Sequence, residues 1–149
     1  MDLVFATVLS RDEKGCTIRY LAGDQTPVWV PYSAAVTEHI YIRRRELVAV
    51  NRATEPPQIV WRWIRAEVLE LRGDRVVAGA HGLCAEMTPR NPALPLKKGD
   101  EVWVGGYGGE KYIEDLVRGD GPADPEGLAA VAFPLIEARY EAHGSAARS

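Results

Sequence analysis

Turn-forming residues divide most of this chain into segments too short for ordinary helices. Gly, Pro, Asp and Asn gather at positions 23–24, 56–57, 73–74, 89–95 and 99–100, and these residue types favour turns. Between the turns lie short runs rich in Val, Ile, Leu and aromatic residues, which favour strands. Many short strands at this spacing are typical of a barrel or a sandwich. The sequence therefore predicts a mainly β protein.

The expected strands cover much of the first 104 residues. Their ranges are 3–9, 16–21, 28–30, 41–50, 59–71, 75–80, 83–87 and 101–104. The polar segment SRDEKG, which ends at Gly15, predicts a hairpin between the first two strands.

A weak internal repeat groups these strands into two units. The segments ATVLSRDEKGCTIRY, from Ala6, and AEVLELRGDRVVAG, from Ala66, both read Ala-x-Val-Leu, turn, strand. The segments ELVAV, from Glu46, and DEVWV, from Asp100, match as closing strands. Each unit has the size of a small SH3-like or OB-like barrel, and a single larger barrel is the alternative.

The expected organisation follows from this repeat. It comprises a barrel-like unit over residues 1–50, a linker over 51–58, a second barrel-like unit over 59–117, and a loop with a short C-terminal helical segment over 118–149. The linker contains two prolines, which favour a stiff spacer.

Asp124 and Pro125 are suited to cap and open the C-terminal helix. Pro134 is expected to kink or restart it. Helical spacing continues weakly through Leu128, Val131 and Leu135.

The composition is that of a globular protein. Hydrophobic residues make up 46% of the 149 residues, charged residues make up 26%, and the formal net charge is −3. These values argue against a disordered or fibrous chain. No apolar run approaches the roughly 20 residues of a membrane span, and the start Met1-Asp2 is unlike a signal peptide. We expect a cytoplasmic protein with no membrane partner, in which Cys16 and Cys84 are reduced core thiols.

A glycine-rich stretch, GGYGGEK, runs from Gly105 to Lys111 and invites comparison with a phosphate-binding loop. Such a loop reads G-x-x-x-x-G-K-[ST], because a hydroxyl must reach the metal ion. Here Tyr112 follows the lysine and Glu110 precedes it, which disfavours an anion. We therefore interpret the stretch as a bend between two strands, with Gly106 and Gly108 supplying positive φ.

His81 and Cys84 have the H-x-x-C spacing of metal ligands. A zinc site needs about four such ligands, and the remaining Cys16, His39 and His143 are scattered. On a strand, positions 81 and 84 point to opposite faces unless Gly82 bulges the strand. We expect no metal, no cofactor and no catalytic set, and an enzyme that uses Cys84 and His81 is the weakest alternative.

Arginine and aromatic residues interleave in the middle of the chain, in YIRRRE from Tyr41 and WRWIR from Trp61. This combination can grip a nucleic-acid backbone and stack its bases. The same pattern is typical of a half-buried strand with Trp61 and Trp63 in the core and the arginines in water. The candidate partner-binding residues are Tyr41, Arg43, Arg44, Arg45, Arg62 and Arg65.

The second unit resembles the small β-barrel of hydrogenase-maturation chaperones. AEVLELRGDRVVAGAHGLCAEM, followed by LKKGDEVWVGGYGGEKYIEDL, has the same order of strand, Gly-Asp turn, strand and K-x-G-D-x-V-x-V. The resemblance covers about a third of the chain and implies a barrel. Those chaperones begin Met-Cys, whereas this chain begins Met1-Asp2, so no functional residue is carried over.

A small barrel with exposed arginine and aromatic residues, and without a catalytic set, favours a non-catalytic binding or adaptor protein that recognises a protein partner. The alternative is a regulator that binds RNA or single-stranded DNA in transcription or translation. The negative net charge favours the protein partner, because it opposes the approach of a polyanion.

Overall fold

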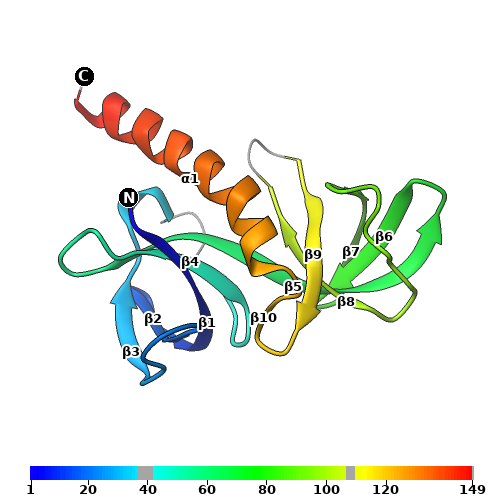
Figure 1. The fold of residues 1–149 in the computed structure, drawn as a ribbon, viewed down its shortest axis with the longest axis horizontal. Coiled ribbons are helices and arrows are strands. Elements are labelled where there is room, and N and C mark those ends of the chain that lie inside the picture. Colours follow the sequence, from blue (N-terminus) through cyan, green and yellow to red (C-terminus); the bar gives the residue numbers. More distant parts are fainter. Residues whose placement is uncertain (37–41, 107–109, 149) are drawn as a thin grey trace.

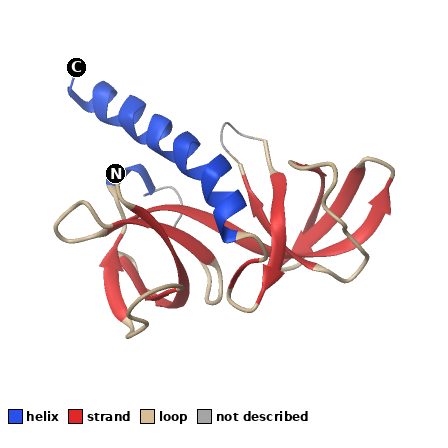
Figure 2. Ribbon diagram, viewed as in Figure 1, coloured by secondary structure: helices blue, strands red, loops and turns tan. Residues whose placement is uncertain are grey.

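The structure is a computed structural model that describes residues 1–36, 42–106 and 110–148. Strands dominate, and a helix forms the C-terminal part (Figure 2). The elements are β1 (Leu3–Arg11), β2 (Gly15–Tyr20), β3 (Val28–Pro31), the 3-10 helix η1 (Ala34–Val36), β4 (Leu47–Asn51), β5 (Gln58–Arg72), β6 (Arg75–Ala80), β7 (Leu83–Pro89), β8 (Glu101–Gly105), β9 (Tyr112–Arg118), β10 (Gly121–Pro122) and α1 (Pro125–Arg148). The predicted mainly β fold with a C-terminal helix is confirmed.

A closed barrel forms the second half of the strand region. β5 pairs with β6 and with β8, β6 pairs with β7, and β8 pairs with β9, all antiparallel. A short parallel ladder between β7 and β9 closes the ring. We call these five strands the closed barrel; it corresponds to the small barrel that the sequence predicts.

The first strand set comprises β1 to β4 and the beginning of β5. These strands follow the order β3, β2, β1, β4, β5, and one parallel bridge between Tyr32 and Ile59 links the chain after β3 back to β5. β5 is 15 residues long and belongs to both sets: its beginning pairs with β4 and its remainder with β6 and β8. Figure 1 shows the two sets side by side, with β5 running between them.

The two sets share irregularities as well as strand order. A bulge in the β1–β2 ladder lies between Val8 and Ser10, and its counterpart in the β5–β6 ladder lies between Val68 and Glu70. The β4–β5 and β8–β9 ladders also shift at matching points, Ala49/Val50 and Trp103/Val104. Since bulges are specific features of a strand pair, the echo of Ala-x-Val-Leu in the sequence corresponds to a repeated backbone pattern.

The turns that lead into β4 and β8 are alike too. The backbone N–H of Arg43 donates to the Glu46 carboxylate at 2.7 Å, and that of Lys97 donates to the Asp100 carboxylate at 2.8 Å. The residue before each carboxylate has a left-handed backbone: Arg45 at φ 69° and Gly99 at φ 93°. The predicted strand over 41–50 is therefore too long at its start, because this turn precedes β4.

The unit boundaries drawn from the sequence stay a prediction. Residues 52–57 connect β4 with β5, and those two strands pair with each other. The segment assigned to a linker thus lies between neighbouring strands of one sheet.

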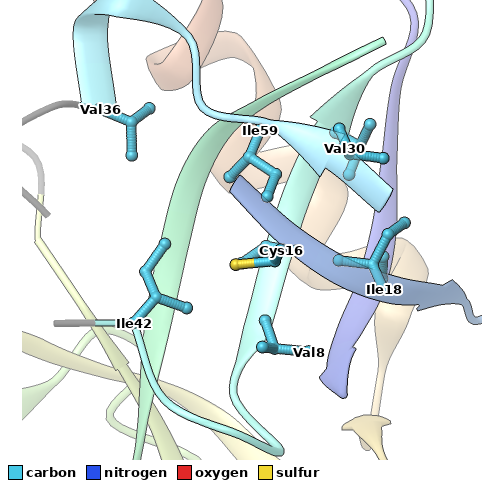
Figure 3. Packing of buried hydrophobic residues seen from close by; sticks show 10 residues of the cluster. Val8, Cys16, Ile18, Val30, Val36, Ile42 and Ile59 are labelled. Carbon is cyan, nitrogen blue, oxygen red and sulfur yellow. The ribbon is translucent and has the colours of Figure 1, made fainter. Parts of the chain in front are cut away.

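The first strand set encloses a dense core. Its side chains come from β1 to β5, η1 and the segment before β4, and Figure 3 shows them around the Cys16 thiol. Cys16 is fully buried, as predicted, whereas Cys84 is exposed, which corrects the expectation of two core thiols. The core members are Ala6, Val8, Cys16, Ile18, Val30, Val36, Ile42, Val48, Val50 and Ile59.

A second cluster joins the sheet to α1. Trp63 is fully buried, and its ring centroid lies 5.5 Å from that of Phe5, which in turn lies 4.9 Å from that of Phe133 on α1. Trp61 belongs to the same cluster. The tryptophans of β5 are core residues and not a stacking platform, so the interpretation of this segment as a half-buried strand is correct for Trp61 and Trp63.

The helix begins as predicted. The Asp124 carboxylate accepts a hydrogen bond from the backbone N–H of Gly127 at 3.1 Å, which is the geometry of a helix cap. Its buried stripe is Leu128, Ala132 and Ile136, and not the predicted stripe of Leu128, Val131 and Leu135, because Val131 and Leu135 are exposed.

Pro134 lies inside α1 without ending it. The residue is exposed. Proline has no backbone N–H to donate to the carbonyl one turn earlier, and water can donate to that carbonyl instead. Among the described residues, no helix combines the length and apolarity needed to cross a bilayer.

Candidate binding pocket of the closed barrel

A pocket of about 380 Å³ opens into the closed barrel. Its inner wall is apolar and includes Ala66, Ala78 and Met87, which belong to the barrel core. Its mouth carries ionisable side chains. The lining residues are Arg43, Glu46, Arg62, Ile64, Ala66, Ala78, Ala80, His81, Leu83, Cys84, Ala85, Met87, Val104 and Lys111.

The pocket exists because β6 carries alanines where β2 carries large side chains. In the first strand set Val8 pairs with Ile18, and in the closed barrel the matching Val68 pairs with Ala78. Two residues further along, Tyr20 of β2 corresponds to Ala80 of β6. Ile18 is fully buried in its own core. The closed barrel therefore lacks the side-chain volume that fills the same place in the first strand set.

Glu46 forms the polar end of the pocket and is 1% exposed. Its Oε1 accepts the Arg43 backbone N–H at 2.7 Å and lies 3.5 Å from Nη1 of Arg62. Its Oε2 lies 3.9 Å from Nε2 of His81. Burial raises the pKa of Glu46 above its ordinary value, while the Arg43 N–H, Arg62 and His81 act in the opposite direction.

Two cations at the mouth have no ion-pair or hydrogen-bond partner for their side chains among the described residues: Arg43 and Lys111. Both are exposed. A neighbouring pocket of about 340 Å³ shares Arg62 and Lys111 and reaches Arg139, which lies over the Trp61 ring. The mouth is therefore more basic than the protein as a whole.

An unpaired strand edge borders the pocket. The ladder between β7 and β9 consists of Thr88 with Tyr112 and Pro89 with Ile113. Residues 83–87 of β7 pair with β6 on one side and, within the part of the chain that the structure describes, with no strand on the other. Leu83, at the start of this edge, is 79% exposed.

The five predicted partner-binding residues that the structure describes separate into three groups. Arg43 and Arg62 line the pocket. Arg65 lies apart from it, where its guanidinium holds the Glu101 carboxylate at 2.6 and 3.3 Å. Arg44 and Arg45 are exposed in the turn before β4 but do not line the pocket, and Tyr41 lies outside the described residues.

The expectation that the arginines of β5 lie in water is wrong. The side chain of Arg62 is 17% exposed and that of Arg65 is 14% exposed, and both pair with carboxylates. Of the two predicted residues that line the pocket, Arg43 and Arg62, Arg43 is therefore the one whose side chain a partner can reach.

His81 and Cys84 both line the pocket. His81 and Gly82 have φ values of 56° and 80° and form the two-residue turn between β6 and β7, so neither obeys the alternation of a strand. Among the described residues, no group of three or more His, Cys, Asp or Glu side chains is placed to hold a metal ion.

The glycine-rich stretch joins β8 to β9, as the interpretation of a bend requires, although residues 107–109 lie outside the described residues. Gly106 does not have the predicted positive φ. A Cβ at this position would collide with the backbone carbonyl of Glu110, so close approach of two chain segments is the reason for glycine.

Glu46, Ala78, Ala80 and Lys111 were not among the predicted site residues. A signal for the alanines was available: aligning the two units places AGA of the second opposite IRY of the first. No family model and no curated protein matches the chain.

Proposed function

We propose that the protein is a non-catalytic binding module, an adaptor that recognises an extended segment of a partner protein. The segment adds a strand to the free edge of β7 and reaches the adjacent pocket. The observation that carries this proposal is the coincidence of an unpaired strand edge with an apolar pocket beside it.

Strand addition combines two kinds of contact. Backbone hydrogen bonds along an exposed edge supply affinity, and pockets for alternate side chains supply specificity. Residues 83–87 supply the edge, and the exposed Leu83 enlarges the apolar surface beside it. Edges of this kind are usually protected by charge, proline or a covering element. Glu86 supplies a charge on this one, but Leu83, Cys84 and Ala85 are uncharged and exposed, which favours a functional role for that part of the edge.

The alternative function, binding of RNA or single-stranded DNA, has less support. Stacking requires accessible aromatic rings, yet Trp61 and Trp63 are buried. Arg62 and Arg65 already pair with carboxylates. The exposed Arg44 and Arg45 are the residues that favour this alternative, and a salt titration with oligonucleotides tests it.

The orientation of the backbone groups on β7 supplies a sharp test. Ala80 and Leu83 flank a two-residue turn, so they form a hydrogen-bonded pair, and the N–H of the next residue, Cys84, points away from β6. Cys84→Pro therefore removes an outward N–H without breaking the ladder to β6. Cys84→Ser is the matched control, because it removes the thiol and keeps the N–H.

Peptides are first selected from a displayed random library against the native protein, and their affinities are then measured in solution by fluorescence anisotropy. Cys84→Pro should weaken binding at least tenfold, and Cys84→Ser should leave it within about twofold, with both variants folded by circular dichroism. Equal binding by all three proteins, or no selected peptide, would refute strand addition at this edge. Oligonucleotide binding that weakens with salt and is lost when Arg43, Arg44 and Arg45 become Ala would support the alternative.

A further inference from the structure

We infer that the pocket takes a bulky aliphatic or aromatic side chain of the partner segment, next to which the segment carries an acidic residue. This inference rests on the proposed function and specifies the partner that the same site selects. It draws on the comparison between the two strand sets and on the charges at the pocket mouth.

The first strand set shows what occupies this position when the protein fills it itself. Ile18 packs there against Val8 and other apolar side chains, and it is fully buried. Its counterpart Ala78 is also buried, but it lines the open pocket. Because the backbone pattern around the two residues repeats, a branched or aromatic side chain entering from outside would replace the missing volume.

The first strand set is also sealed by the segment between β3 and β4. Val36 and Ile42 from that segment are buried and point into the core (Figure 3). The corresponding segment between β7 and β8 contributes Leu94 and Leu96, which are only partly buried against the barrel core. Compared with the first strand set, the closed barrel thus has smaller side chains along its inner wall, and the residues that cover it are less buried.

The charges at the mouth indicate an acidic neighbour for this anchor. Glu46 is engaged by the Arg43 N–H and lies near Arg62, whereas the guanidinium of Arg43 and the ammonium of Lys111 are exposed. An Asp or Glu beside the anchor would meet these two cations. Because both are exposed, their attraction is screened and contributes selectivity more than affinity.

Ala78→Ile tests the anchor, since it gives the closed barrel the residue that the first strand set already carries. The matched control is Ala130→Ile on the exposed face of α1. Ala78→Ile should keep the protein folded, with an unchanged or higher melting temperature, and should weaken the selected peptides at least tenfold. Ala130→Ile should leave their binding within about twofold.

The peptides supply a second test. Replacing the anchor with Ala should weaken binding at least tenfold, and replacing the neighbouring Asp or Glu with its amide should weaken it severalfold in low salt and less in high salt. Lys111→Ala should abolish most of that amide effect.

The outcomes separate the two proposals. Peptides that require the Cys84 N–H but bind Ala78→Ile as well as the native protein would overturn the pocket inference and leave strand addition standing. An absence of peptide binding would overturn strand addition and this inference with it. Saturable binding of anilinonaphthalene sulfonate alone, lost in Ala78→Ile, would assign the pocket to small amphiphiles instead. Self-association lost in Ala78→Ile, measured by sedimentation, would assign it to a second copy of the chain.

Discussion

Ile18→Ala should destabilise the protein strongly, because it recreates in the first strand set the space that is open in the closed barrel. The Ile18 side chain is fully buried, with 0% of its surface exposed to solvent. Truncation of a buried Ile to Ala costs roughly 2–5 kcal/mol, with the higher values where the surroundings cannot collapse. Bulky β-branched neighbours such as Val8, Val30 and Ile59 place this site toward the upper half, at about 3–5 kcal/mol.

The assay is equilibrium unfolding in urea, followed by far-ultraviolet circular dichroism. For a chain of this length each kcal/mol corresponds to roughly 2–4 °C in melting temperature, so thermal unfolding should shift by about 6–20 °C. Val131→Ala, at an exposed position of α1, is the control and should change the free energy of unfolding by about 0.5 kcal/mol or less. A loss below about 1 kcal/mol for Ile18→Ala would refute the claim that this core is sealed.

Three further perturbations test other contacts. Burial raises the pKa of Glu46 in the folded protein. The stability that the protonated Glu46 contributes is therefore fully present below the ordinary pKa of 4.5 and is lost as pH rises through the raised pKa. Glu46→Gln should gain stability relative to the native protein over this pH range, and a difference in unfolding free energy that stays constant with pH in urea titrations would contradict this. Gly106→Ala should lower the free energy of unfolding by about 1–3 kcal/mol, because its Cβ meets the Glu110 backbone; unchanged urea unfolding would contradict the close approach. Arg65→Ala should cost about 1 kcal/mol through loss of the two hydrogen bonds to Glu101, and the loss should be smaller in Glu101→Gln in a double-mutant cycle.

Much of the fold can be predicted from local signals. Gly73 and Asp74 lie between two apolar runs and favour a turn by their residue types alone, and the structure has β5 and β6 on either side of them. Asp124 and Pro125 likewise predict the start of α1 because capping depends on adjacent residues. Signals of this kind need no knowledge of distant contacts.

The pocket could not be predicted in the same way. Alternation in WRWIR is the same whether Trp61 and Trp63 face a core or a ligand, and α1, which covers them, lies about 70 positions away in the chain. The small size of Ala78 becomes informative only once its register with Val68 is known. Glu46 looks like a surface residue until the turn before β4 folds its carboxylate onto the Arg43 N–H.

The shared strand β5 has a consequence for how the molecule comes apart. A nick in its middle, near Ile64, would divide β5 between its partners, because residues 58–63 pair with β4 and residues 64–72 pair with β6 and β8. Each fragment would keep its own ladder to β5, so the two halves of the intact chain are coupled by the continuous backbone of β5 and by the cluster that packs Leu47 of β4 with Trp103 of β8. Through these links the two halves should lose and regain protection from hydrogen exchange together. Occupancy of a site in the closed barrel would then slow amide exchange in β1 and β4 as well, at positions that no ligand touches.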